Sequence, residues 1–264
     1  MTRFKTTEVS DDQFENGLKF ITVKTPNLKG RGDICLYVPD TEEVDLPVVT
    51  LLHGVYGSAW IWALKGGAAH TVAKLIKDQR IQPMILVMPS DGLWGDGSAY
   101  LPHNSLDFEK WIVEDVRDAV IENLPSASAQ SPQFISGLSM GGYGALRLGA
   151  KYANQYRGIS AHSSITAVDQ MSLFVEESLE NYRQNDERLE AFEIISSNRD
   201  ILPPLRFDCG ENDLLIEHNR KLHQQLQASN IDHQYEEFEG AHEWTYWQEH
   251  LNDTLLFFNN LLKK

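Results

Sequence analysis

The fold is decided by the stretch Phe134-Ile135-Ser136-Gly137-Leu138-Ser139-Met140-Gly141-Gly142-Tyr143-Gly144-Ala145-Leu146-Arg147-Leu148-Gly149. Its first two residues are apolar and predict the end of a strand, and Ala145 to Ala150 predict a helix. Between them lies Gly-x-Ser-x-Gly, the pattern of a tight strand-to-helix turn that lifts a serine hydroxyl above the carboxyl edge of a sheet. Glycines two residues before and after Ser139 fit this turn, because a Cβ there would collide with neighbouring backbone. The sequence therefore predicts a reactive serine that faces the N-terminus of the following helix.

Length and composition favour one domain without nucleic-acid or membrane partners. The chain has 264 residues, of which 42% are hydrophobic, and we expect a single α/β domain over residues 1–264. The net charge is −15 and no basic patch stands out, which argues against binding to nucleic acid or anionic membranes. No stretch approaches the roughly 18 apolar residues of a membrane span, and Met1–Ser10 lacks an apolar run of signal-peptide length. We therefore expect a soluble, cytoplasmic protein, and the sequence does not distinguish a monomer from a homo-oligomer.

Neither cysteine suggests a metal or redox site. Cys35 and Cys209 both lie in predicted strands, and neither has a metal-ligand or redox spacing. We expect two buried thiols, no metal and no cofactor.

Apolar runs along the chain predict alternating strands and helices. Residues 18–23 and 33–38 alternate apolar and polar side chains and predict an antiparallel hairpin at the start of the fold. Residues 47–53 are apolar almost throughout and predict a central strand buried on both faces. Further strand signals lie at residues 83–88, 156–161, 205–210 and 235–238, and helical periodicity lies at 68–77, 107–123, 216–226 and from 244 onward. This alternation predicts a mostly parallel sheet with helices on both faces.

The predicted central strand runs into a second candidate part of the site, His53-Gly54-Val55-Tyr56-Gly57. A loop at this place supplies one backbone N–H to an oxyanion, and the residue after the nucleophile supplies the other. We assign these two donors to Val55 and Met140. Taken alone, His53-Gly54 is more often a simple strand-ending turn.

A carboxylate is expected just beyond the end of a late strand. Three acids compete near residues 205–210, namely Asp208, Glu211 and Asp213. Asp208 lies inside the predicted strand, whereas Asp213 lies in the loop beyond the turn at Gly210. We therefore favour Asp213 over Glu211.

The last predicted strand runs into Gly240-Ala241-His242. Of the nine histidines, only His242 has such neighbours and follows the candidate acid in the chain. The order Ser139, Asp213, His242 is the order of an α/β-hydrolase. The sequence therefore predicts an α/β-hydrolase fold with a mostly parallel central sheet, an N-terminal antiparallel hairpin and helices on both faces. His242 would act as the base for Ser139, with Asp213 orienting the imidazole.

The substrate pocket is less explicit in the sequence. Four aromatic residues lie near these loops and are candidates to line it, although core packing explains each equally well: Tyr56, Trp60, Trp94 and Trp244. Residues 169–200 are polar with helical spacing and interrupt the strand–helix alternation. We interpret them as a helical, cap-like excursion over the pocket, or else as a surface crossover without substrate contact. His162 ends a predicted strand near the site. It is a candidate pocket residue, or else it bonds to local backbone.

In four stretches the chain resembles the esterases related to esterase D: Leu51–Gly54, Gly137–Ala145, Cys209–Asp213 and Glu239–Trp247. That family includes S-formylglutathione hydrolase, feruloyl and acetyl esterase domains, tributyrin-type esterases and the mycolyltransferases. The likeness runs from about Asp33 to Leu251 and implies a serine carboxylesterase that hydrolyses small acyl or aryl esters through an acyl-enzyme. S-formylglutathione hydrolases typically carry cysteine in the oxyanion loop, where this chain has Val55 to Ser58, so a glutathione thioester is not the expected substrate.

Three other functions remain open at this stage. Acyl transfer to a sugar or another alcohol would use the same three residues, with an acceptor in place of water. A non-catalytic binding protein on a hydrolase fold is a second alternative, against which the complete set of catalytic residue types argues. Peptide hydrolysis is a third, for which no peptide-binding feature is visible.

Overall fold

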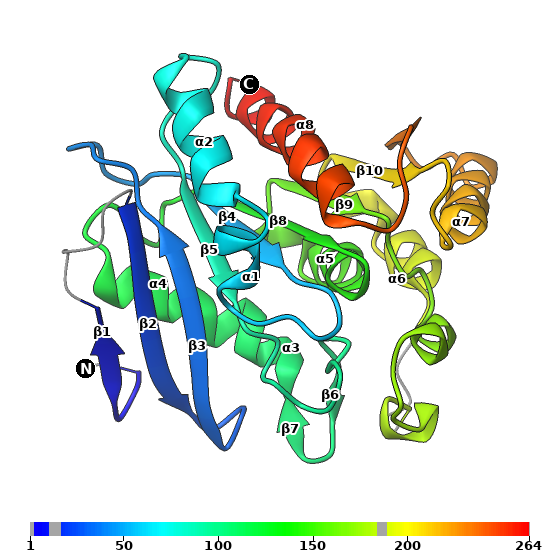
Figure 1. Cartoon of the computed structure of the whole chain (residues 1–264), viewed down its shortest axis with the longest axis horizontal. Coiled ribbons are helices and arrows are strands. Elements are labelled where there is room, and N and C mark those ends of the chain that lie inside the picture. The colour runs from blue at the N-terminus through cyan, green and yellow to red at the C-terminus, as the bar shows by residue number, and fades with distance from the viewer. Residues whose placement is uncertain (1–2, 11–16, 184–188, 264) are drawn as a thin grey trace.

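A computed structural model describes residues 3–10, 17–183 and 189–263. The described residues form a nine-stranded sheet with the strand order β1-β2-β3-β5-β4-β8-β9-β10-β11 (Figure 1). These strands are β1 Thr7–Val9, β2 Leu18–Thr25, β3 Gly30–Tyr37, β4 Val48–Leu52, β5 Ile85–Pro89, β8 Gln133–Leu138, β9 Gly158–His162, β10 Leu205–Gly210 and β11 Gln234–Phe238. A separate two-stranded ribbon joins β6 Pro102–His103 to β7 Leu106–Asp107.

The six neighbouring strands β5, β4, β8, β9, β10 and β11 are parallel, and the edge formed by the N-terminal strands is antiparallel. Strand β2 pairs antiparallel with β1 on one side and with β3 on the other, and β3 pairs antiparallel with β5. All later neighbours pair in parallel. This topology confirms the predicted mostly parallel sheet with an N-terminal hairpin, to which β1 adds a strand that the sequence did not predict.

Helices cover both faces of the sheet. They are α1 Ile61–Leu64, α2 Ala68–Lys77, α3 Phe108–Lys110, α4 Arg117–Asn123, α5 Met140–Lys151, α6 Ala191–Ser197, α7 Ile216–Ala228 and α8 Trp244–Leu262, with short 3₁₀ turns η3 Ala153–Gln155, η4 Val168–Leu173, η5 Leu179–Asn181 and η6 Arg199–Ile201. Helices α2 and α8 lie side by side over one face (Figure 1). Within the described residues, none of these helices combines the length and the apolar character needed to cross a bilayer.

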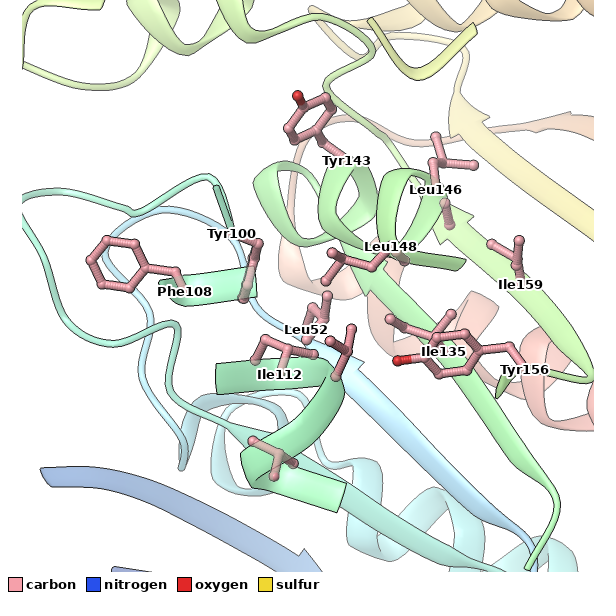
Figure 2. Close-up of a cluster of buried hydrophobic side chains, with 14 of the residues drawn as sticks. Leu52, Tyr100, Phe108, Ile112, Ile135, Tyr143, Leu146, Leu148, Tyr156 and Ile159 are labelled. Atoms are coloured by element: carbon pink, nitrogen blue, oxygen red, sulfur yellow. The ribbon is translucent and has the colours of Figure 1, made fainter. Parts of the chain in front are cut away.

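Alternate side chains of β4 enter two separate cores, because successive residues of a strand point to opposite faces. Val49 and Leu51 pack in the core beneath α1, α2 and α8. Val48 and Leu52 pack in the larger core beneath α4 and α5. Figure 2 shows part of this larger core, where strand residues meet α5 and the helix before it: Leu52, Ile135, Ile159, Leu146, Leu148, Phe108 and Ile112. The predicted burial of this strand on both faces is confirmed.

The helix predicted over residues 107–123 is interrupted by a wider turn. Asp107 caps it as expected, accepting a hydrogen bond from the Lys110 N–H at 2.9 Å. The segment η2 Trp111–Val116 then adopts π-helical geometry before α4 continues. There the Trp111 indole N–H donates to the Ser90 carbonyl oxygen at 2.7 Å. Apolar periodicity alone does not reveal such a local widening, because the same residues remain on the buried side.

The excursion predicted over residues 169–200 is only partly helical, which corrects the expectation from its spacing. Its described residues contain η4, η5, α6 and η6, and only α6 is a regular helix. A bridge between Ala167 and Glu190 closes the base of the excursion. Residues 184–188 lie outside the described residues. The Glu176 N–H bonds outside the excursion, to the Asp96 carboxylate at 3.0 Å, and the turns η4 and η5 around it stay short.

Candidate active site

The predicted turn joins β8 to α5 and holds Ser139 in a strained backbone conformation. Its φ is +54° and its ψ is −119°, a region that non-glycine residues seldom occupy. Its N–H donates to the carbonyl oxygen of His162 at 3.0 Å, which fixes the turn to β9. A Cβ added at Gly137 would lie 2.3 Å from the Gly141 oxygen, and one at Gly141 would lie 2.3 Å from the Leu52 oxygen. Both glycines are therefore required by close backbone approach.

Three side chains from different loops meet in one hydrogen-bonded line. The His242 Nε2 atom lies 3.0 Å from Ser139 Oγ, and its Nδ1 atom lies 2.9 Å from Asp213 Oδ2. The strand order explains the meeting, because β8, β10 and β11 are parallel and end at one edge of the sheet. Because a carboxylate only accepts hydrogen bonds, Nδ1 carries the proton and Nε2 is free to accept the serine proton.

The surroundings of Asp213 and His242 differ in their access to water. The Asp213 side chain is fully buried, and its Oδ1 atom also accepts the Leu215 N–H at 2.8 Å. The His242 side chain is 15% exposed. The carboxylate is therefore held in place, while the imidazole is partly open to solvent.

The other two candidate acids lie elsewhere. Glu211 is exposed. Asp208 is buried beneath the site, where its carboxylate contacts His162 Nδ1 at 3.0 Å and Arg206 Nη2 at 2.9 Å. Burial alone would raise the pKa of Asp208, but the interactions with His162 and Arg206 outweigh it and hold that pKa below its ordinary value. His162 is thus a buried structural partner of Asp208 and not a pocket residue.

The two predicted oxyanion donors lie in the loop after β4 and at the start of α5. Within the described parts of the chain, neither the Val55 N–H nor the Met140 N–H has a hydrogen-bond acceptor. The loop approaches the serine closely, since a Cβ added at Gly54 would lie 3.3 Å from Ser139 Cβ. N–H groups without acceptors near a serine hydroxyl suit a developing negative charge. Their side chains both adjoin Gly97, where a Cβ would lie 2.5 Å from Met140 Sδ and 3.3 Å from Val55 Cγ1.

The loop that carries Val55 is braced by His53, a role that the sequence did not suggest. The buried His53 imidazole accepts the Asp91 N–H at Nε2 (3.0 Å), so its Nδ1 donates to the Gly54 oxygen (2.7 Å). The Tyr100 hydroxyl donates to the His53 carbonyl oxygen at 2.9 Å. A neutral imidazole therefore fixes the start of the loop. Asp91 follows β5 at the same edge of the sheet as His53. This position after a strand was the signal in the sequence that could have indicated a contact between the two residues.

The four candidate pocket aromatics divide into two pairs. Tyr56 and Trp60 are 67% and 47% exposed, and Trp60 lines a surface cavity of about 340 Å³. Trp94 and Trp244 are half-buried in ring clusters, Trp94 with Tyr182 at 5.6 Å and Trp244 with Trp62 at 5.7 Å. These contacts favour packing as the role of the second pair.

Two aromatic rings that were not predicted touch the His242 imidazole directly. Phe174 stacks on it with centroids 5.3 Å apart and planes 29° apart. Trp247 meets it edge-on at 5.0 Å. Trp247 belongs to the apolar stripe of α8, whereas Phe174 lies in the polar segment 169–200, whose helical spacing did not point to a contact with His242.

The thiols and possible metal ligands lie apart from this chemistry. Cys35 and Cys209 are free and buried, and burial raises the pKa of Cys35 to about 12. Such a thiol stays protonated near neutral pH and is a poor nucleophile. Among the described residues there is no group of three or more His, Cys, Asp or Glu side chains that could hold a metal ion.

Comparison with known proteins identifies the family. The family model described as "Putative esterase" matches residues 25–258. An acetyl esterase from Caldicellulosiruptor saccharolyticus is 30% identical over 233 residues, which cover 80% of this chain and 83% of that protein.

Solved structures agree on the fold. An S-formylglutathione hydrolase from Agrobacterium tumefaciens matches with a TM-score of 0.80 at 19% identity, over 99% of this chain and 100% of that one. A ferulic acid esterase matches with a TM-score of 0.78 at 20% identity, over 98% and 99% of the two chains. These likenesses confirm the α/β-hydrolase fold. Since the family match spans most of its length, the chain belongs to this family of esterases.

Proposed function

We propose that the protein is a serine carboxylesterase that hydrolyses small acyl or aryl esters through Ser139, His242 and Asp213. The observation that carries the proposal is the continuous line from Ser139 Oγ to His242 Nε2 (3.0 Å) and from His242 Nδ1 to Asp213 (2.9 Å). Membership of the esterase family and the acetyl esterase relative support an ester as the substrate.

Acylation begins when His242 Nε2 takes the proton of the Ser139 hydroxyl as its oxygen attacks the ester carbonyl carbon. The carbonyl oxygen becomes negatively charged and binds the N–H groups of Val55 and Met140. Asp213 stabilises the charged imidazole. Collapse of this intermediate breaks the bond to the alcohol, and His242 gives its proton to the departing oxygen.

Deacylation repeats the sequence with water. His242 removes a proton from a water molecule that attacks the acyl-enzyme, and the serine oxygen leaves with that proton. No metal or cofactor takes part in either half of this reaction. Acyl transfer differs only in that an alcohol attacks in place of water.

The test is the substitution Ser139→Ala. We expect it to abolish turnover of p-nitrophenyl acetate and covalent labelling by a fluorophosphonate, because Ser139 carries the hydroxyl that His242 Nε2 contacts. The exposed Ser172→Ala is the matched control and should keep full activity. Activity of Ser139→Ala near that of the unchanged protein would exclude this mechanism. Product analysis with added methanol then separates hydrolysis from acyl transfer.

A further inference from the structure

Residues 168–182 form a strap that reaches the reacting groups. The strap begins just after Ala167, whose bridge to Glu190 closes its base, and its short helical turns lie below α6 in Figure 1. Within it, Phe174 stacks on the His242 imidazole at 5.3 Å. The strap therefore supplies a ring that contacts the proposed catalytic base.

Two reciprocal hydrogen bonds clamp the strap to the loop at residues 93–98. The Glu176 N–H donates to Asp96 Oδ2 at 3.0 Å, and the Asp96 N–H donates to Glu177 Oε1 at 3.0 Å. The approach is close, because a Cβ at Gly95 would lie 2.2 Å from Glu177 Oε1. These charge-assisted bonds to backbone N–H groups are stronger than ordinary ones and hold the two segments together.

Further contacts tie the strap to the oxyanion loop. The Tyr56 hydroxyl donates to the Phe174 carbonyl oxygen, and the Tyr182 hydroxyl donates to the Gly97 oxygen at 2.8 Å. Gly97 itself packs against the Met140 side chain. Phe174 is therefore fixed relative to both the imidazole and the oxyanion donors.

The chemistry indicates which half of the ester meets Phe174. His242 Nε2 protonates the departing alcohol oxygen, so that oxygen must lie within hydrogen-bond reach of Nε2. The carbonyl oxygen is held on the other side, by Val55 and Met140. The alcohol part therefore extends along the imidazole, where Phe174 covers one ring face.

We propose that Phe174 is a specificity-determining residue that selects an uncharged aryl alcohol as the leaving group, and that Asp96 and Glu177 are positioning residues that hold it. This inference rests on the proposed function. An aromatic wall favours a flat apolar ring, and the clamp carboxylates repel an anionic one. In support, burial and the charges of Asp96, Glu176 and Glu177 raise the pKa of Tyr56, as expected beside a negative potential.

Acetyl esters with different alcohols test the role of Phe174, because they share one acyl-enzyme and differ only in acylation. Phe174→Ala should lower kcat/KM for phenyl acetate, relative to ethyl acetate, by about 2- to 10-fold, the range for one aromatic contact. Phe174→Tyr keeps the ring and should restore the ratio. The preference among acetyl, butyryl and hexanoyl esters of one phenol should stay unchanged.

The control and the contrary results are distinct. Leu173→Ala removes the neighbouring side chain, which is 54% exposed, and should leave the ratio unchanged. The role of Phe174 is overturned if a folded Phe174→Ala variant keeps the ratio of kcat/KM for phenyl acetate to kcat/KM for ethyl acetate. It is also overturned if the variant changes the preference among acyl groups and leaves that ratio as it was. Turnover by Ser139→Ala would instead overturn the proposed function.

A double-mutant cycle tests the positioning role. Glu177→Ala removes the acceptor for the Asp96 N–H and should reduce the aryl preference as Phe174→Ala does. In the Phe174→Ala background it should cause no further reduction, whereas additive losses would refute the positioning role. Glu177→Gln keeps an oxygen acceptor but removes the charge, so kcat/KM for 4-acetoxybenzoate should rise relative to phenyl acetate. No such rise would refute the charge selection.

Discussion

The substitution Gly141→Ala tests how closely the turn around Ser139 is fitted. The new Cβ would lie 2.3 Å from the Leu52 oxygen, 2.5 Å from the Leu52 carbonyl carbon and 2.6 Å from the His53 oxygen. All three atoms are backbone, so no side chain can move aside. The first contact is about 0.7 Å short of the 3.0 Å that real Cβ atoms keep. The start of α5 must therefore shift by a comparable distance.

That shift moves the groups on which the proposed mechanism depends. Met140 N–H and Ser139 Oγ both lie within two residues of the substitution. A misplacement near 1 Å costs about 100-fold in rate, and loss of one oxyanion donor costs about 100- to 1000-fold. We therefore expect kcat/KM for p-nitrophenyl acetate to fall at least about 100-fold, equivalent to about 2.7 kcal/mol.

The assay pairs steady-state kinetics with the unfolding temperature. Gly30→Ala is the matched control, because its nearest atom, the Leu28 oxygen, would lie at an ordinary 3.5 Å. We expect that variant to keep its activity. A folded Gly141→Ala enzyme with kcat/KM within threefold of the unchanged protein would refute the reasoning from backbone contact.

Two further predictions concern the carboxylates. Asp213→Asn should lower kcat by about 10⁴-fold while the protein stays folded, because an amide favours the wrong imidazole tautomer. Steady-state kinetics measures the loss of kcat, and circular dichroism shows whether the variant is folded. A loss below tenfold would contradict the role of Asp213. The pKa of Asp208 is lowered in the folded protein, so its stabilising contribution is present above its ordinary pKa and disappears as the pH falls below it. The unfolding temperature should thus fall less steeply from pH 5 to pH 3 in Asp208→Asn than in the unchanged protein, and equal slopes would contradict this.

Local signals predicted the elements that position the site. The glycines around Ser139 are readable because the turn requires them at fixed offsets, and the structure gives the atoms they would strike. Asp213 and His242 were identified by their places after late strands, which parallel pairing brings to one edge. Such features depend on residues near in sequence and on the topology of the sheet.

The strap could not be predicted in the same way. Its contacts join polar residues about 80 positions apart, such as Asp96 with Glu177, and no periodicity marks such pairs. Its apolar spacing resembled a helix, yet part of its backbone bonds outward. Nothing in the sequence around Phe174 marks it as a neighbour of His242, so only the fold reveals their contact.

The loops that carry the acid and the histidine are joined independently of the bond between Asp213 and His242. The Asn212 N–H donates to the Gly240 oxygen at 2.9 Å, and a Cβ at Gly210 would lie 2.6 Å from that oxygen. Tyr246 packs against Gly240 and donates its hydroxyl to Asp208 at 2.9 Å. Because these backbone and buried contacts already fix both loops, replacing the Asp213 carboxylate should alter the imidazole and not the fold. The expected loss of activity in Asp213→Asn can therefore be assigned to chemistry at His242.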